Sequence, residues 1–356
     1  IIAFNHFYKL DLWLIILMAC LALAPLLNHP ESMRWSTVLY SYMFILTFMA
    51  YYRLLNKGFF KLHQFINLLK YLLLAYFITL LIQQFCVLMD LPVFNVSNYN
   101  PTLPWKLNSL SAEPSHSGRI LALLFYCFIS AKEIFLQRSY SLKKDAFKDK
   151  WIWFAFLWTM ITMGSATALV FIFIVLLKFI KLKNIIPLLA LSTIIILILT
   201  NYDIALLDRA IKTGEAVITL DYKEVIAADH GGSQRIIPMM ILISMVEVFT
   251  YNGLFGHGID TVSSFLYKYI KGVPDTFSGG GFLHLWYEYG FLVFLILMLF
   301  TLKTTVYKGQ LVNIIFWFFL VFSYGINNQI VWLCIVLLFT LNFYTMKNKI
   351  IYGRNT

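Results

Sequence analysis

The sequence is poor in charged residues. Only 13% of its 356 residues are Asp, Glu, Lys or Arg, whereas 60% are hydrophobic. Soluble globular domains carry about 25% charged residues, so this composition excludes an ordinary water-soluble domain. With 17 acidic residues in the whole chain, it also excludes a long disordered tail and a nucleic-acid-binding domain. The chain is therefore predicted to be a membrane protein.

Cysteine is also scarce. The four cysteines stand within apolar runs, where a thiol behaves as a small hydrophobic side chain; they are Cys20, Cys86, Cys127 and Cys334. Their spacing matches neither a disulfide framework nor a zinc site, so we predict no metal and no cofactor. The chain begins Ile1-Ile2-Ala3 without the pattern of a cleavable signal peptide, and we expect its first apolar run to be retained as a helix.

Long apolar runs recur along the whole chain. A helix of about 20 residues crosses the hydrocarbon layer of a bilayer, and within lipid a helix satisfies its own backbone hydrogen bonds. The predicted fold is therefore all-α, a polytopic transmembrane helical bundle. We predict about ten spans: 11–28, 36–54, 64–89, 119–136, 151–164, 166–180, 184–201, 281–302, 309–325 and 330–346.

Lys and Arg are distributed unevenly between the two sets of connections. One set, which includes the C-terminal tail, contains 16 cations, whereas the opposite set contains nine in far more residues. Because cytoplasmic loops carry the excess of Lys and Arg, both termini are predicted to be cytoplasmic. The opposite set is predicted to be external; it comprises 29–35, 90–119, 202–280 and 326–329.

The pattern predicts three regions. Residues 1–201 form an N-terminal bundle of about seven spans with an external loop at 90–118. Residues 202–280 form a large periplasmic loop that contains nine of the 17 acidic residues, and residues 281–356 add three spans and a cytoplasmic tail. Loops of such length are usually functional. Within this loop the apolar run 236–249 is too short to span, which favours an interfacial or re-entrant helix.

The stretch 151–180 would be about 45 Å long as one helix, too long for an untilted pass. Its segment Met163-Gly164-Ser165-Ala166-Thr167 offers a break. An even number of crossings preserves the charge pattern downstream. Two short passes and a re-entrant pair are equally compatible with it.

Two arginines are candidates for binding an anionic ligand at the external side. Arg235 follows a polar turn and begins an apolar helix, where a planar guanidinium suits phosphate. Arg119 stands at the outer end of the predicted span 119–136. For both, the alternative is a side chain that merely extends to the membrane surface.

A glycine-rich turn carries two more candidates. Gly256 and Gly258 would let the backbone approach a ligand, and they flank the imidazole of His257, with the carboxylate of Asp260 three residues further on. A simple surface turn is the alternative. The later run 278–281, Ser-Gly-Gly-Gly, suits either a hinge or a close-approach loop.

Two acidic residues complete the set. Glu113 lies just before a predicted helix, where it is either a general base or a plain helix-capping residue. Glu288 falls within the apolar helix predicted over 282–300. An ionisable group there is expensive and is a functional candidate, with a structural role near the interface as the alternative.

In their order along the chain, five features resemble the bacterial family of O-antigen polymerases and O-antigen ligases, which are integral membrane glycosyltransferases. The resemblance covers about two thirds of the chain. It is carried by Glu113-Pro114-Ser115, the segment 162–168, Arg235 at the opening of a large external loop, the segment 254–260, and the segment 284–291.

The sequence departs from this family at two places. The family often has Arg after the Ser of its third motif, whereas this chain has Ala166 after Ser165. Ligases usually show a His-Asn pair where this chain has Gly279. The polymerase branch is therefore favoured over the ligase branch, and the Glu-Pro-Ser motif points the same way.

The resemblance implies transfer of a growing undecaprenyl-diphosphate-linked glycan onto a lipid-linked repeat unit, at the periplasmic face of the bacterial inner membrane. It implies Arg235 as the diphosphate clamp, Arg119 as a second cation, and Glu113 or His257 as the base, without metal. The residues implied to bind or orient the sugar are Gly256, Gly258, Asp260, His284 and Glu288.

The implied partners are the lipid-linked glycan donor and acceptor, membrane lipid, a chain-length regulator and a flippase, with no nucleic acid. Two alternatives stay open. The first is a ligase that transfers the glycan to lipid A-core, and the second is a transporter of lipid-linked sugars. The chain shows no internal repeat of the kind found in transporters, which favours an enzyme. Whether the product is O-antigen or another exopolysaccharide is open.

Overall fold

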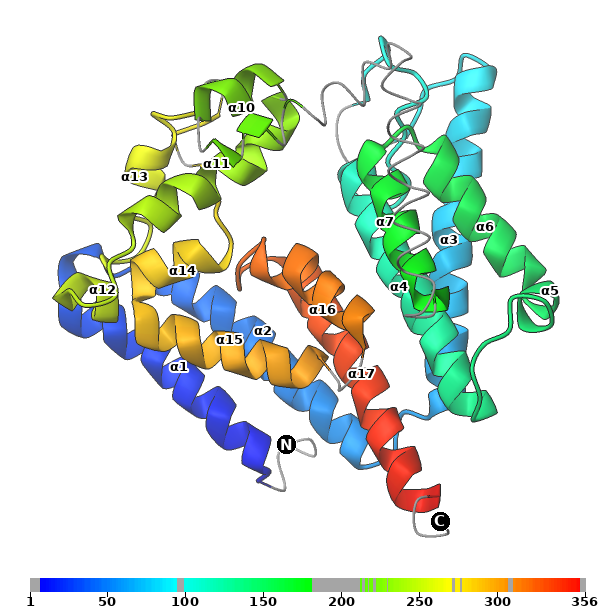
Figure 1. The fold of residues 1–356 in the computed structure, drawn as a ribbon, viewed down its shortest axis with the longest axis horizontal. Coiled ribbons are helices and arrows are strands. Elements are labelled where there is room, and N and C mark those ends of the chain that lie inside the picture. Colours follow the sequence, from blue (N-terminus) through cyan, green and yellow to red (C-terminus); the bar gives the residue numbers. More distant parts are fainter. Residues whose placement is uncertain are drawn as a thin grey trace. The chain divides into compact units, whose positions relative to one another are not determined.

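The computed structural model describes residues 7–94, 99–180, 222–228, 230–270, 273–275, 277–306 and 310–352, together with a few positions between 212 and 219. Within these ranges every regular element is a helix (Figure 1). The predicted all-α fold is therefore confirmed for the described residues. The predicted span 184–201 lies outside them.

Four helices in the described ranges are long and apolar enough to cross a membrane. They are α1 (Lys9–Asn28), α2 (Trp35–Asn56), α3 (Leu62–Leu88) and residues 329–347 of α17 (Gln329–Tyr352). They match four of the predicted spans. This makes the structure compatible with a membrane protein, but the count of ten spans is not confirmed.

Other predicted spans correspond to shorter or interrupted helices. The span predicted over 281–302 is divided into α14 (Phe282–Tyr289) and α15 (Phe291–Thr305). The division falls at Gly290, whose φ of 87° no helix accommodates. The span predicted over 309–325 consists of α16 (Leu311–Trp317) followed by a π-helical turn, Phe318–Phe322.

The chain divides into two compact units, which are described separately. Unit 1 comprises 1–50, 180–303 and 317–332, and unit 2 comprises 51–179, 304–316 and 333–356.

Unit 2 is organised around α4 (Pro114–Leu136), which packs against α3 and α7 (Ala166–Leu176). Nearly every α4 residue from 117 to 131 is buried. A Cβ atom at Gly118 would lie 2.8 Å from the Cβ of Ala168, so the glycine allows α4 and α7 to approach closely. Helix α4 corresponds to the predicted span 119–136 but begins five residues earlier.

The stretch 151–180 forms two helices rather than one. Helix α6 (Lys150–Thr162) ends at the predicted break, where Gly164 has a φ of 68°. Helix α7 then returns beside α6, because the ring of Phe179 lies 6.0 Å from that of Trp153 near the start of α6. A single straight pass is therefore excluded.

Unit 1 contains α1, most of α2, the helices from residue 222 to residue 303, and the π-helical turn. Leu14, Leu17 and Leu21 form a fully buried stripe on α1, as expected for a helix that packs one face against its neighbours. The predicted loop 202–280 includes the helices α10 (Tyr222–Ala228), α11 (His230–Met245), α12 (Tyr251–Phe255) and α13 (Ser263–Leu266).

This region has a hydrophobic core of its own. Its buried members come from α10, α11, α13 and α14, and include Val225, Ile237, Leu242, Leu266 and Leu283. The run 236–249, predicted as an interfacial or re-entrant helix, contributes the second half of α11 and so packs into this core. The depth of α11 in a bilayer stays a prediction.

The glycine run 278–281 is a close-approach loop. A Cβ at Gly280 would lie 2.3 Å from the side chain of Leu242 on α11, and one at Gly281 would lie 2.1 Å from the carbonyl oxygen of Phe322. The chain can therefore pass between α11 and the π-helical turn only without side chains at these positions.

Candidate functional site

Unit 1 brings together two of the segments singled out in the sequence. The backbone N–H of His257 donates to the carbonyl of Tyr287 at 2.9 Å, and that of Gly258 donates to the carbonyl of Glu288 at 3.2 Å. The φ of Gly256 is 92°, and a Cβ there would lie 2.2 Å from the carbonyl oxygen of Glu288. The 256–260 turn is therefore bonded directly to the C-terminal end of α14.

The turn between α1 and α2 also contacts the 256–260 turn. The side chain of Asn28 donates to the carbonyl of Gly256. A Cβ at Gly258 would lie 2.4 Å from Oγ of Ser32. Both glycines are thus needed for close packing, and the alternative of a simple exposed turn does not fit them.

An ion pair joins the same two segments. Nη1 of Arg34 lies 2.7 Å from Oδ2 of Asp260, and the Arg34 side chain is 65% exposed. Asp260 has a φ of 61°, in the left-handed region that Asp tolerates better than most residues. Arg34 was missed in the sequence because its partner is 226 residues away. The sequence did contain one signal that could have identified Arg34: it is the one Lys or Arg within residues 29–35.

His257 is oriented by a backbone carbonyl. Its Nδ1 lies 3.1 Å from the carbonyl oxygen of Tyr287, and a carbonyl can only accept a hydrogen bond. Nδ1 therefore carries the proton, and in the neutral ring Nε2 keeps its lone pair. The imidazole also stacks on the ring of Tyr287, with centroids 4.1 Å apart and planes 6° from parallel. Nε2 is therefore the nitrogen through which His257 could accept a proton.

The side chain of Glu288 contacts two other parts of the site. Its side chain is buried, its Oε1 accepts from the backbone N–H of Val262 at 3.2 Å, and the same oxygen lies 2.9 Å from Nε2 of His284. It stands at the end of the short helix α14, not within a long apolar helix as predicted. Burial favours neutral His284, but the facing carboxylate outweighs burial and raises the pKa of His284 above its ordinary value.

Tyr289 adds a buried hydroxyl next to these groups. Its side chain is 3% exposed, and within the described part of the chain its Oη has no hydrogen-bond partner. Burial, together with the nearby carboxylates of Glu288 and Asp260, raises the pKa of Tyr289. The hydroxyl therefore keeps its proton at neutral pH and can donate a hydrogen bond.

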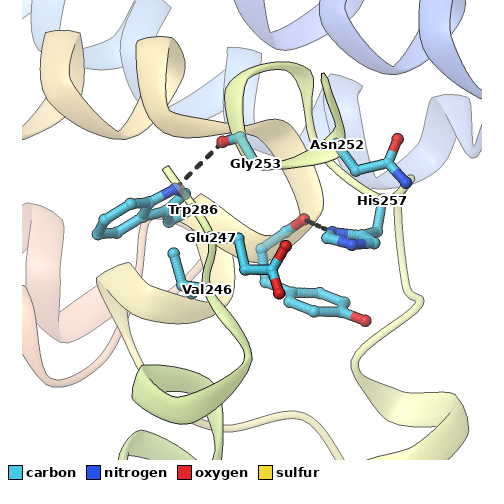
Figure 2. Close-up of a pocket in the computed structure, with 7 residues that line it drawn as sticks. Val246, Glu247, Asn252, Gly253, His257 and Trp286 are labelled. Atoms are coloured by element: carbon cyan, nitrogen blue, oxygen red, sulfur yellow. Dashed lines mark hydrogen bonds between the residues drawn. The ribbon is translucent and has the colours of Figure 1, made fainter. Parts of the chain in front are cut away.

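A shallow depression, too small to enclose a water molecule, lies beside His257 (Figure 2). The indole Nε1–H of Trp286 donates to the carbonyl of Gly253 at 3.2 Å, which joins α14 to α12. The depression is lined by Val246, Glu247, Asn252, Gly253, His257, Trp286 and Tyr287.

Arg235 stands in the second turn of α11. The helix begins at His230, five residues before the position expected from the sequence, so Arg235 does not open it. The side chain of Arg235 lies outside the described part of the structure, and its role as a diphosphate clamp stays a prediction.

Glu113 and Arg119 belong to unit 2. Glu113 occupies the N-cap position of α4, but its exposed side chain makes no capping hydrogen bond and instead accepts from Oγ of Ser115 at 3.1 Å. The side chain of Arg119 is 6% exposed, so this guanidinium is buried rather than extended toward water. Glu113 is therefore the N-cap residue of α4 without a capping hydrogen bond from its side chain, which leaves both of its predicted roles open, whereas the surface role does not describe Arg119.

Six of the predicted site residues are thus brought together, whereas Glu113 and Arg119 lie in unit 2 and the side chain of Arg235 lies outside the described part of the structure. Those brought together in unit 1 are Gly256, His257, Gly258, Asp260, His284 and Glu288. No protein-family model matches the chain, and neither a curated protein nor a solved structure is significantly similar to it.

Proposed function

We propose that the protein is a membrane glycosyltransferase that polymerises undecaprenyl-diphosphate-linked oligosaccharide repeat units at the periplasmic face of the bacterial inner membrane. One observation carries most of the support. The segments 254–260 and 284–291, two of the five features that carry the resemblance to polysaccharide polymerases, are hydrogen-bonded to each other, and the contact of Nδ1 of His257 with the Tyr287 carbonyl leaves Nε2 to accept a proton.

The proposed reaction is one substitution at the anomeric carbon of the donor glycan. A hydroxyl oxygen at the non-reducing end of the acceptor attacks that carbon, and its proton moves to Nε2 of His257. The bond between the anomeric carbon and the diphosphate oxygen breaks, and its electron pair leaves with undecaprenyl diphosphate. The glycosyl diphosphate is the activated group, so no nucleotide sugar is consumed.

The remaining side chains have roles that follow from this step. Negative charge grows on the departing diphosphate, and a guanidinium stabilises such charge; Arg235 is proposed for this task. His257 is preferred to Glu113 as the base because its tautomer is set by Tyr287. Glu288 positions the 256–262 segment, and the protonated hydroxyl of Tyr289 is a further donor near it.

The external location is consistent with the charge pattern. The turn 29–35 and the region 202–280 were both predicted to be external from the distribution of Lys and Arg. The contacts of Asn28 with Gly256 and of Arg34 with Asp260 bring these two segments together, which supports the prediction that both are external. In this proposal, the reaction takes place where the segments 29–35 and 202–280 meet.

The test is chain extension by the purified full-length protein in detergent, with lipid-linked repeat units as the sole substrate. The expected product is a ladder of polymers, with release of undecaprenyl diphosphate. His257→Gln should abolish the ladder, whereas His63→Gln, at an exposed position on α3, should leave it unchanged. A wild-type protein that only moves the lipid-linked units across a vesicle membrane would instead be a transporter.

A further inference from the structure

We infer that residues 138–151 of unit 2 bind the headgroup of an anionic phospholipid, with exposed lysines at its phosphate and exposed aromatic side chains beside its acyl chains. These residues connect α4 to α6 and include the short helix α5 (Asp145–Lys148), which lies at the start of α6 (Figure 1). The inference goes beyond the proposed function, because it depends on the location of the chain in a membrane and not on polymerisation.

Within the described residues, four lysines of this segment have no carboxylate partner. Residues 120–180 contain seven Lys or Arg side chains but three carboxylates. Three of the cations pair with these carboxylates, in the pairs Arg138–Asp145 at 2.6 Å, Lys132–Asp149 at 3.0 Å and Lys178–Glu133 at 2.7 Å. The other four cations are exposed and carry the excess positive charge; they are Lys143, Lys144, Lys148 and Lys150.

The paired carboxylates hold the backbone that carries these lysines. The Asp145 carboxylate accepts from both terminal nitrogens of Arg138, at 2.6 and 2.7 Å, and from the backbone N–H of Ser141 at 2.8 Å. The hydroxyl of Tyr140 donates to Asp149 at 3.1 Å. The lysines therefore extend from an ordered turn, and binding a ligand there costs little backbone entropy.

An apolar stripe begins at the same place and continues along α6. Its members recur every three or four residues, as on one face of a helix, and each is at least 39% exposed; they are Phe147, Trp151, Phe154, Trp158 and Ile161. A continuous exposed apolar surface of this kind marks a contact with lipid or with another protein. Because α6 corresponds to a predicted membrane span, lipid is the expected occupant.

Lys150 marks the boundary between the charged and the apolar parts. Its Nζ lies 5.4 Å from the ring centroid of Phe147 and 5.8 Å from that of Trp151. Trp is enriched where a membrane helix meets the headgroups, and the apolar stem of Lys lets its ammonium reach the headgroup region from there. A phospholipid has the same order of groups, from phosphate to acyl chain, so one molecule can contact both parts.

An anionic headgroup fits this surface better than the other candidates. A zwitterionic headgroup carries its own cation, which weakens its attraction to the lysines, and a free phosphate would leave the apolar stripe uncovered. An excess of Lys is expected in any cytoplasmic connection. This connection differs because its carboxylates are already paired, its backbone is held by them, and its lysines adjoin the stripe. Basic clusters beside a membrane helix attract anionic lipids.

The experiment measures, by native mass spectrometry, how much added phospholipid the detergent-solubilised full-length protein retains. Dioleoylphosphatidylglycerol is the anionic probe and dioleoylphosphatidylcholine the zwitterionic one. The wild-type protein should retain the anionic lipid preferentially. Affinity for that lipid should fall at least about tenfold in a variant that carries Lys143→Gln, Lys144→Gln, Lys148→Gln and Lys150→Gln.

A matched control removes the same charge from exposed positions elsewhere. It carries Lys9→Gln, Lys61→Gln, Lys268→Gln and Lys347→Gln, and it should keep the wild-type preference. The double variant Phe147→Ser with Trp151→Ser should bind both lipids more weakly. If size exclusion shows that the first quadruple variant has lost its fold, the double variants Lys143→Gln with Lys144→Gln and Lys148→Gln with Lys150→Gln replace it.

Three outcomes would overturn the inference. The first is a wild-type protein without preference for the anionic lipid, which would leave a protein partner as the occupant. The second is an equal loss of affinity in the two quadruple variants, which would show a general effect of charge and no site at 138–151. The third is displacement of the lipid by soluble glycerol phosphate at the same concentration, which would identify a site for the free anion.

Discussion

Nε2 of His284 lies 2.9 Å from Oε1 of Glu288, one turn further along α14. The same carboxylate oxygen accepts from the N–H of Val262, so this ion pair connects the helix to the segment that carries His257 and Asp260. The charge state of His284 therefore affects how firmly that segment is held.

The stability of the protein should depend on pH through His284. Its pKa is raised by Glu288, so the pair stabilises the folded state fully below the ordinary His value of about 6.5. This contribution is lost as pH rises through the raised pKa. Thermal unfolding from pH 5 to pH 9 should show wild type and His284→Asn converging at the alkaline end. A difference that stays constant over this range would contradict the assignment.

Gly256→Ala should destabilise the protein more than Gly58→Ala. Both glycines have positive φ, but a Cβ at Gly256 would collide with the Glu288 carbonyl, whereas a Cβ at Gly58 meets nothing within 4 Å. The left-handed backbone alone costs about 1–2 kcal/mol, and forced repacking adds about 1–3 kcal/mol. Denaturant unfolding in detergent measures the two losses. Equal losses would show that the contact of Gly256 with α14 is not tight.

Breaking the Arg34–Asp260 ion pair should have little effect on the free energy of unfolding but should greatly reduce the rate of chain extension. Exposed ion pairs contribute about 0–1 kcal/mol, so a double-mutant cycle with Arg34→Ala and Asp260→Asn should give a coupling energy in that range. Chain extension should fall about tenfold or more, equivalent to at least 1.4 kcal/mol of activation free energy. Full activity in both variants would limit the pair to a structural role.

Arg235→Ala should abolish chain extension while the protein remains inserted and folded. A lost guanidinium leaves the departing diphosphate without its proposed counter-charge. Lys268→Ala, another cation of the predicted external region, serves as the control. Polymer length and yield are the readout, and wild-type values for Arg235→Ala would remove this residue from the mechanism.

The proposed sidedness can be checked by cysteine labelling in intact cells. In a background without Cys20, Cys86, Cys127 and Cys334, a membrane-impermeant maleimide should label Glu31→Cys and Lys223→Cys from the periplasm. Lys143→Cys should react only after the cells are opened. The reverse pattern would place the His257 region in the cytoplasm and exclude the proposed reaction there.

Much of the fold was predictable because it depends on local composition. Four of the predicted spans have the length and hydropathy of membrane-crossing helices, and Gly164 marked the reversal between α6 and α7. The break at Gly290 was missed because the apolar run continues through it. Its cause is a contact distant in the sequence: a Cβ at Gly290 would lie 2.2 Å from the carbonyl of Leu254.

The site was predictable by residue type but not by pairing. His257, Asp260 and Glu288 stood out because polar groups are conspicuous in an apolar chain. The residues that orient them did not: Arg34 is an isolated cation in the sequence, and the role of Tyr287 depends on its carbonyl, which every residue has. No periodicity reports such contacts, because they arise only when distant segments pack.

The bond from Asn28 to the carbonyl of Gly256 spans 228 residues. Translation adds about 5–20 residues per second. Gly256 is therefore synthesised roughly 10 to 50 seconds after Asn28. During that interval Arg34 lacks its ion-pair partner Asp260, and Ser32 lacks the packing of Gly258. In a nascent chain stalled before residue 256, the turn between α1 and α2 is therefore exposed, and a chaperone or a neighbouring copy can bind it.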